Sequence, residues 1–550
     1  MSGALSLACH IGCRKIVTLL TQKLHQPTGI QLGLGCSLRV ARFSCHFSES
    51  CRYMTSKHWT LVGGAVACLI VATYSSAAFS APWLKPGDNR ARFALQKLAD
   101  RGHLNRTTST WPVMMGTVQS GLGRETGNDA PAIGGPLAYL KFEMDEQGQQ
   151  GWRAEYELGA TSEPTFVRGF QAGPRETAET SLNVQWQGES WAFGIKPGLA
   201  ANPEDDDTFR LDGSYLAATA GNWVFGAGAI DRWWGPGWQS SLILSNNARP
   251  MPAVWLNRKD AAEPETSWLK WIGPWQFTTF AGQLESERAV PEAKMIGMRL
   301  TVRPIDGLDI GFSRAIMFGG EGRPEGASTI WNALIGRDNG QLEENDPGNQ
   351  LASIDARYGF SIGDQAMGVY GQMMGEDEAG AFPARKSWLL GTDWTTQLLE
   401  SDQQWFVEYA NTLADDFLGN AMPNITYTHS RYRSGYRHKG RNMASTFDGD
   451  AETLTLGVFN FFPDGRNLSA SLGYLDLNKD GANRTVIPDD DIFYNVPEGD
   501  QKAAIASVGY GTQFLNGWLD LTAQATDKKI ELLGGEKDQW SVGAAWRYRF

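Results

Sequence analysis

Polar and apolar residues alternate along most of this chain, and the alternation is clearest in the final segment, 538–550. One face of an extended strand there carries only apolar side chains, while the other face carries small residues and two arginines. The apolar face consists of Trp540, Val542, Ala544, Trp546, Tyr548 and Phe550. A period of two with one apolar face is typical of a half-buried β-strand. Soluble β-sandwiches have such strands, and so do outer-membrane barrels, whose strands alternate between lipid and lumen.

The same alternation recurs in nineteen segments between residues 137 and 550, and it predicts nineteen strands. The first two segments, 137–145 and 152–160, are predicted to form a hairpin. Many segments carry charged residues on their polar face, which suits a wide, wet lumen better than the core of a sandwich. The other strands are expected at 180–187, 190–197, 208–219, 222–230, 266–272, 274–284, 293–303, 307–317, 350–361, 365–373, 386–396, 404–411, 452–462, 467–476, 502–514, 517–526 and 538–550.

The connections between these segments alternate between short turns and long loops. Outer-membrane barrels show this asymmetry, with the long loops outside the cell, and an even strand number places both termini in the periplasm. We therefore predict an all-β transmembrane protein, an antiparallel outer-membrane β-barrel of about 18 strands, with about 20 as the alternative. The long loops are expected at about 231–265, 318–349, 412–451 and 477–501.

The chain before the barrel, which is predicted at 137–550, is expected to contain three segments. Residues 54–80 have a basic start, a short apolar run and small residues, which is the pattern of a secretory signal peptide. Residues 1–53 show no clear periodicity, and we interpret them as an upstream extension of the reading frame, with an unusually long targeting segment as the alternative. Residues 81–136 are predicted to be a periplasmic segment in which Asp88 caps a short amphipathic surface helix.

The chain that follows the signal peptide is strongly acidic and contains no cysteine. All six cysteines lie at or before Cys68, so no disulfide is expected in the barrel. Seven of the 49 Lys and Arg residues and one of the 61 Asp and Glu residues precede residue 81, which leaves 42 basic and 60 acidic residues and a net charge of −18. An acidic chain of this kind is not expected to bind nucleic acid. The mean hydropathy of −0.34 argues against a helical membrane protein.

The candidate chemistry lies in two of the long loops. The first stretch, 231–250, combines aromatic rings, which stack on sugar rings, with polar groups that make paired hydrogen bonds to hydroxyls or carboxylates. The alternative is that this loop folds into the lumen and its side chains fill the space, and both interpretations can hold together. The candidate binding residues are Asp231, Arg232, Trp233, Trp234, Trp238 and Arg249.

The second stretch, 431–441, is a basic cluster in an otherwise acidic chain. Arginine together with aromatic rings suits an acidic glycan, whereas the alternative is that these cations face acidic groups in the lumen. The acidic runs Glu204–Asp207 and Asp489–Asp491 are expected to be solvated loop, with divalent-ion binding as the alternative. The candidate binding residues of the basic cluster are Tyr432, Arg433, Tyr436, Arg437 and Arg441.

Several segments of the chain resemble the Wzi family of capsule assembly proteins. The longest is Asp231–Pro250, which reads DRWWGPGWQSSLILSNNARP, and Pro82–Asp88, Tyr427–Ser430 and Gly435–Arg441 are similar to other parts of the family. The resemblance implies an outer-membrane barrel of about 18 strands whose mouth is obstructed by extracellular loops, with helices on the periplasmic side. It also implies a role in attaching or organising capsular polysaccharide at the cell surface.

The lead hypothesis is therefore a lectin-like outer-membrane protein that binds or organises capsular or another exported polysaccharide. A saccharide porin or gated channel is the alternative, and an outer-membrane hydrolase is a third hypothesis. We expect no enzyme, cofactor or metal site, because residues 81–550 contain only three histidines and neither a Gly-x-Ser-x-Gly nor a His-Glu-x-x-His motif. The expected partners are the polysaccharide, outer-membrane lipid, lipopolysaccharide and the barrel assembly machinery, which would recognise the aromatic strand that ends at Phe550.

Overall fold

The computed structural model describes residues 83–122, 130–171, 173–326, 328–329, 331, 348–376, 385–416, 419–488 and 491–550. They all belong to one compact unit, Gly63–Phe550. The predicted upstream segment 1–53 and the predicted signal peptide 54–80 lie outside the described residues and stay predictions.

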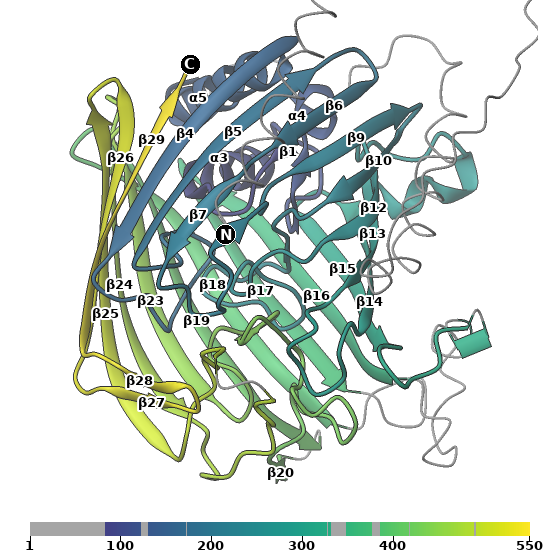
Figure 1. The fold of residues 1–550 in the computed structure, drawn as a ribbon. Coiled ribbons are helices and arrows are strands. Elements are labelled where there is room, and N and C mark those ends of the chain that lie inside the picture. The colour runs from purple at the N-terminus through teal and green to yellow at the C-terminus, as the bar shows by residue number, and fades with distance from the viewer. Residues whose placement is uncertain are drawn as a thin grey trace, which may run out of the picture. The chain divides into compact units, whose positions relative to one another are not determined.

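A ring of antiparallel strands forms the wall of a closed barrel (Figure 1). The segments of the ring are β4 (Gly151–Thr161), β5 (Ala178–Gln187), β6 (Trp191–Ile195), β7 (Gly198–Ala201), β8 (Phe209–Arg210), β9 (Tyr215–Ala220), β10 (Trp223–Gly228), β12 (Ala253–Arg258), β13 (Trp275–Gln283), β14 (Lys294–Ile305), β15 (Leu308–Phe318), β16 (Gly348–Ile362), β17 (Gln365–Glu376), β18 (Arg385–Leu398), β19 (Ser401–Asp416), β20 (Ala421–Met422), β23 (Glu452–Phe461), β24 (Asn467–Leu477), β25 (Gln501–Phe514), β26 (Gly517–Thr526) and β29 (Trp540–Arg549).

The predicted strand number of about 18 is confirmed. β6 and β7 both pair with β5 and share one position of the ring, while β8 and β9 share the next position. The two-residue β20 only extends the edge of β19. Counted in this way, the 21 segments make 18 strands, and β29 closes the ring on β4 through pairs such as Trp546 with Leu158.

Two of the predicted strands are wrong, and one strand was missed. The segment 137–145 lies in a helix, α5 (Ala130–Gly148), so the barrel begins at Gly151 and not at residue 137. The segment 266–272 forms a 3₁₀ helix, η3 (Ser267–Ile272), and β12 lies inside the stretch 231–265 that was expected to be a loop.

The physical reason for the first error is a helical period inside an alternating run. Ala138, Leu140, Lys141 and Glu143 all have high helix propensity. The buried positions Ile133, Pro136, Leu140 and Glu143 are three to four residues apart, and they pack one face of α5 while Phe142 stays exposed. In η3, Trp268 and Trp271 are both exposed and lie one turn apart on the same side of the 3₁₀ helix. In a strand, residues three apart would point to opposite faces.

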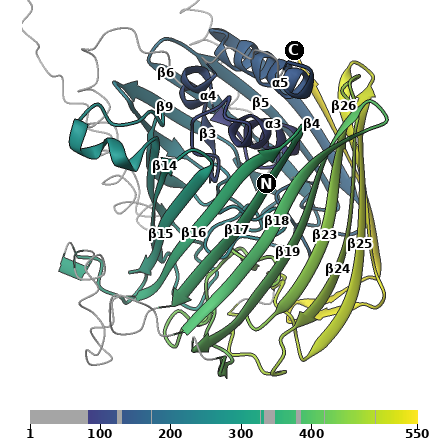
Figure 2. The same ribbon diagram turned by 180° about the vertical axis from the view of Figure 1, so that it is seen from behind.

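Three helices gather at one end of the barrel, which we call the helix end, and the long connections extend from the other, the loop end (Figures 1 and 2). The helices are α3 (Asn89–Asp100), α4 (Met115–Gly121) and α5. α3 forms where a helix was predicted, and the Asp88 carboxylate caps it by accepting a hydrogen bond from the Ala91 amide, but the helix is buried and not at the surface as predicted. In the described part of the chain, no helix has the length and apolar character needed to cross a membrane.

Short paired strands lie outside the wall. β1 (Trp83–Leu84) pairs with β3 (Val113–Met114), and β2 (Thr110–Trp111) pairs with β11 (Trp233–Trp234) inside the barrel. At the loop end, β21 (Arg437–His438) pairs with β22 (Arg441–Asn442), and β27 (Ile530–Leu532) pairs with β28 (Gly535–Lys537).

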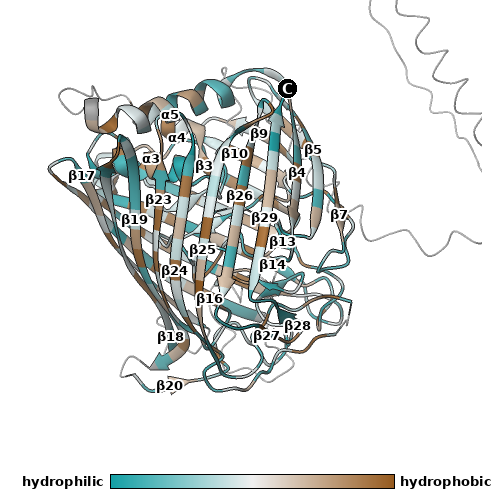
Figure 3. Cartoon of the chain, turned by 90° about the vertical axis from the view of Figure 1, so that its left-hand side faces the viewer, coloured by the Kyte–Doolittle hydropathy of each residue, from teal (hydrophilic) through white to brown (hydrophobic). Residues whose placement is uncertain are grey.

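The two faces of the wall have opposite character. On β23, Leu454 and Leu456 are exposed on the outer face, while Thr453 and Thr455 are buried on the lumen face. Hydrophobic residues recur along the outward strands in Figure 3, between the helices at one end and the polar loops at the other. Exposed apolar and buried polar residues invert the pattern of a soluble protein, and they fit a wall that faces lipid.

Ion pairs between the wall and the N-terminal segment fix that segment inside the helix end. The Arg357 guanidinium on β16 contacts the carboxylates of both Asp100 on α3 and Asp393 on β18, at 2.7 Å each. Lys97 of α3 likewise contacts Asp402 on β19 at 2.8 Å. The lumen-facing charges that the alternation places on the strands therefore anchor α3.

Candidate functional site

The loop that contains the first candidate stretch crosses the lumen. This crossing loop, residues 229–252, leaves β10 and returns to β12, but its centre reaches β19, eight strands further around the ring. There the Glu408 carboxylate accepts hydrogen bonds from the backbone amides of Trp238 at 2.6 Å and Ser240 at 2.7 Å. One buried acid on the far wall thus fixes the tip of the loop.

The three tryptophans of the crossing loop are buried, with at most 1 % of each side chain exposed. Trp238 stacks on Phe406 of β19 at a centroid distance of 6.1 Å, and the guanidinium of Arg92 lies 4.0 Å from the centroid of its ring. Trp234 packs against Phe280 of β13. These rings therefore fill the lumen and are not presented to a ligand outside the barrel.

Gly235 provides the tight turn that the sequence predicts between the tryptophans. Its φ of 138° lies in a region that side chains with a Cβ rarely adopt. The carbonyl groups of the next two residues, Pro236 and Gly237, accept hydrogen bonds from Arg92 of α3 at 2.5 and 2.8 Å. Helix α3 and the crossing loop are consequently one packed unit.

Arg232 and Asp231 lie at the entry to the crossing loop. The Arg232 guanidinium is buried 4.4 Å from the ring centroid of Phe280, and burial lowers its pKa to about 10, so it stays charged near neutral pH. Asp231 is partly exposed and lies 3.5 Å from Arg175.

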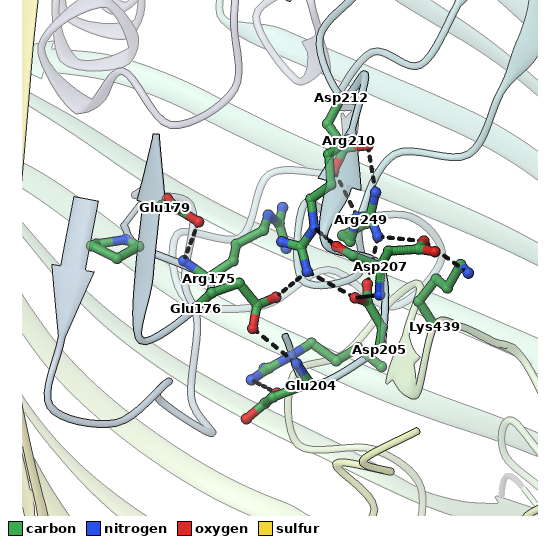
Figure 4. A network of polar contacts seen from close by, with 12 residues as sticks. Arg175, Glu176, Glu179, Glu204, Asp205, Asp207, Arg210, Asp212, Arg249 and Lys439 are labelled. Carbon is green, nitrogen blue, oxygen red and sulfur yellow. Dashed lines mark hydrogen bonds and ion pairs between the residues drawn. The ribbon is translucent and has the colours of Figure 1, made fainter. Parts of the chain in front are cut away.

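Arg249, at the exit of the crossing loop, is the centre of a polar network (Figure 4). Its guanidinium contacts the carboxylates of Asp205 at 2.6 Å, Asp207 at 2.8 Å and Asp212 at 2.7 Å. Hydrogen bonds to these acids outweigh the effect of burial and raise the pKa of Arg249. Lys439 also contacts Asp207, at 2.9 Å. Since Arg441 also contacts Glu204, cations already pair with three acids of the run Glu204–Asp207, for which divalent-ion binding was the alternative.

The second candidate stretch lies in the basic loop, residues 423–451, and most of it is also buried. The hydroxyl of Tyr432 donates to the Gly319 carbonyl at 3.1 Å, and that of Tyr436 donates to the Ile243 carbonyl of the crossing loop at 2.9 Å. The two tyrosines consequently join the basic loop to its neighbours through their side chains.

The three arginines of the basic loop differ in their surroundings. Arg437 is buried and its Nε lies 2.9 Å from the Asp448 carboxylate, while Arg441 is buried and lies 3.1 Å from Glu204. Arg433 is exposed, and it forms no ion pair within the described part of the chain. Of these arginines, Arg433 is therefore the one that a ligand outside the barrel can contact directly.

The described structure thus brings the two candidate stretches together through hydrogen bonds that the sequence did not indicate. The residues that sequence reasoning missed are Arg92, Glu408 and Asp448, which hold the two loops in place. Glu408 lies on the polar face of a correctly predicted strand, so its inward direction was foreseeable, but its partner 170 residues away was not.

Comparison with known proteins identifies the family to which this barrel belongs. Residues 148–540 match the family described as capsule assembly protein Wzi. The chain belongs to this family. A Klebsiella pneumoniae relative, described as an uncharacterized 55.8 kDa protein in the cps region, is 32% identical over 357 residues, which cover 63% of this chain and 69% of that protein.

A solved Wzi-family structure has the same fold. It is the Escherichia coli protein described as Wzi, an outer-membrane protein involved in group 1 capsule assembly and a carbohydrate-binding β-barrel. The match has a TM-score of 0.73 at 25% identity and covers 85% of this chain and all of that one. The present Wzi-family chain is accordingly an outer-membrane β-barrel, as its apolar outer wall requires.

Proposed function

We propose that this Wzi-family barrel is a non-enzymatic binding protein that holds capsular or another exported polysaccharide at the cell surface. The observation that carries the proposal is the crossing loop, which fills the lumen beside β13 and β19 and is bonded to the basic loop. Such a filled barrel offers a preorganised surface at its loop end. The carbohydrate binding and capsule assembly described for the E. coli relative support the same function.

The geometry favours this function over a saccharide porin or a hydrolase. A porin needs an open lumen, whereas here α3 and the crossing loop are packed together across it. Two of the histidines are engaged in local structure: His438 lies 2.5 Å from Glu285, and His429 accepts hydrogen bonds from the amides of Arg431 and Tyr432. These contacts support a structural rather than a catalytic use of both rings.

The proposal also assigns an orientation and further partners. We place the loop end outside the cell and the helix end in the periplasm, with lipid around the apolar wall and lipopolysaccharide at its outer rim. The barrel assembly machinery would recognise the aromatic strand β29. Within the candidate set, we assign direct contact with an acidic polysaccharide to Arg433, while the buried residues position the loop that carries it.

Substitution of two arginines separates these roles. We expect R433Q to fold normally and to reduce binding of the acidic polysaccharide about two- to fivefold, the range for loss of one exposed charge pair. The loss should shrink as salt screens the charges. R437Q should instead destabilise the basic loop, because it leaves Asp448 buried without its partner.

The measurements are cell-attached against released polysaccharide and binding to the purified protein. R466Q is the matched control, since Arg466 is an exposed arginine at the helix end that pairs with Asp464. The combined variant R433Q/R437Q/R441Q removes the three candidate arginines of the basic cluster. If this variant folds, stays closed and retains wild-type polysaccharide, the binding role of the cluster is refuted.

A further inference from the structure

A cavity of about 150 Å³ lies in the lumen beside the crossing loop. Its walls are strands β23 to β26 on one side and, on the other, the crossing loop and residues 162–177, which connect β4 to β5. The volume is about that of a cavity known to hold one benzene ring, and it is well below the ~300–1,000 Å³ of a typical drug-sized ligand site. The space therefore suits one six-membered ring and not an oligosaccharide.

The lining combines aromatic rings with hydroxyl and amide groups. Trp238 of the crossing loop and Phe459 of β23 supply the aromatic rings, and Ser469, Ser507 and Thr522 of the neighbouring strands supply hydroxyls. The Ser507 hydroxyl accepts a hydrogen bond from the Gln524 amide at 3.1 Å and retains its own proton for another partner. Alternating apolar and hydroxyl surfaces are what the two faces and the edge of a sugar ring require.

Arg168 is the one ionisable side chain among the described residues that line this cavity. It is more than nine-tenths buried, and its guanidinium donates to the backbone carbonyls of Gly173 and Pro174 at 2.8 and 2.9 Å. In the part of the chain that the structure describes, it forms no ion pair with a carboxylate. A buried cation without an anion favours an anionic ligand over a cationic one.

A smaller cavity of about 20 Å³, which holds roughly one water, shares several lining residues with the first and reaches the exposed ring of Trp540. Thr165 lines both cavities, and its carbonyl accepts a hydrogen bond from Arg441 of the basic loop at 2.9 Å. The segment that carries Thr165 is therefore bonded to one candidate arginine of the basic loop.

We propose that this cavity binds a single acidic sugar unit, a hexuronate at the end of a polysaccharide chain, with Arg168 as the partner of its carboxylate. The proposal rests on the proposed polysaccharide-binding function and names a site for it that is distinct from the exposed Arg433. The hydroxyls of the strand wall hold the ring edge, and Trp238 and Phe459 cover its apolar side.

The test measures binding of trigalacturonate and of neutral maltotriose to the full chain in detergent. The wild type should bind the acidic probe about tenfold more tightly, the ratio expected from one charge-assisted hydrogen bond of roughly 1.5 kcal/mol. S507F and S469F fill the cavity and should reduce the preference for the acidic probe to at most the two- to fivefold contribution assigned to Arg433. A506F adds the same ring to the lipid-facing side of β25 and should bind like the wild type. R168Q adds no bulk and should reduce the preference for the acidic probe to the same level.

Other outcomes would each contradict the luminal site, the acidic ligand or the proposed function. Folded S507F and S469F that bind like the wild type would overturn the luminal site while the proposed function stands. Equal binding of maltotriose and trigalacturonate by the wild type would overturn the assignment of an acidic ligand. If the bulky variants do not fold, R168Q tests the site, and a wild-type preference for trigalacturonate in R168Q would overturn the role of Arg168. A wild type that binds neither probe nor its own polysaccharide would instead refute the proposed function.

Discussion

Single charged residues decide how the loops of this barrel are held, and Asp450 is one whose charge changes near neutral pH. It lies just before β23, and its carboxylate accepts a hydrogen bond from the Asn424 amide at 2.7 Å. Burial, together with the nearby acids Asp480 and Asp448, raises the pKa of Asp450 to about 7 against the effect of that hydrogen bond. The protonated form is therefore favoured in the folded loop.

The sign of the resulting pH dependence follows from this raised pKa. The contribution of Asp450 to the free energy of unfolding is complete below the ordinary pKa of 3.8, where the group is protonated in both states. This contribution is lost as the pH rises through the folded-state pKa of about 7. We expect the basic loop to be cleaved faster by added protease at pH 8.5 than at pH 5.5. D450N should flatten this difference, whereas D464N, at an exposed turn of the helix end, should not. Identical pH profiles for D450N and the wild type would contradict the prediction.

At the scale of elements, α3 is buried on all sides rather than on one face. All of its residues except Arg90 are buried, although its sequence predicts an amphipathic surface helix. The apolar side packs against the N-terminal core, as expected, while Lys97 and Asp100 on the polar side meet the charged lumen face of the wall. A barrel with a polar interior thus buries both faces of an amphipathic helix.

The arginine that anchors α3 should be essential to its placement. R357M leaves the carboxylates of Asp100 and Asp393 buried without a cation, and we expect it to cost about 3–5 kcal/mol. D364N is the control, because Asp364 pairs with Arg101 at the exposed surface and its loss should cost about 0–1 kcal/mol. The measurement is the rate of proteolysis within residues 83–121 together with the melting temperature. Equal protection of R357M and D364N would show that the ion pairs do not hold α3.

At the scale of the whole molecule, the two ends of the barrel have different constructions. The helix end is closed by the N-terminal segment, by the connection that contains η3 and by short turns, with Arg90 of α3 donating to the Gly465 carbonyl of one such turn at 2.8 Å. The loop end is built from the crossing loop, the basic loop and the acidic run that Arg249 and Arg441 bind. A binding surface for an extracellular polymer belongs at the loop end if that end faces outward.

A topology experiment tests this orientation. A tag inserted after Asn420, in the exposed stretch next to β20, should be labelled on intact cells. A tag inserted after Asp464, in the turn between β23 and β24, should be labelled only after the outer membrane is opened, because that turn lies at the helix end. The reverse labelling pattern would place the loop end in the periplasm and overturn the proposed surface role.

The fold could be predicted largely from the sequence because its signal is local. Lipid outside and water inside impose an alternation of period two on every strand, and this pattern is contained in about ten consecutive residues. The cap of α3 by Asp88 is equally local. The prediction failed at 137–145 because a short run can satisfy both the strand and the helix period, and only the neighbours of Leu140 in the folded chain decide between them.

The candidate site could be located by sequence, but the direction of its side chains could not. Aromatic and basic residues in two loops marked the right segments, yet their burial depends on partners that are distant in the sequence. Arg441 binds Glu204 across 237 residues, and Trp238 binds Glu408 through its amide across 170 residues. The alternation determined which residues of each strand face the lumen, and only the closed ring determined which loop side chains meet them. The sequence itself thus determined the barrel, while the tertiary structure decided that most candidate binding residues fill it and that Arg433 is exposed.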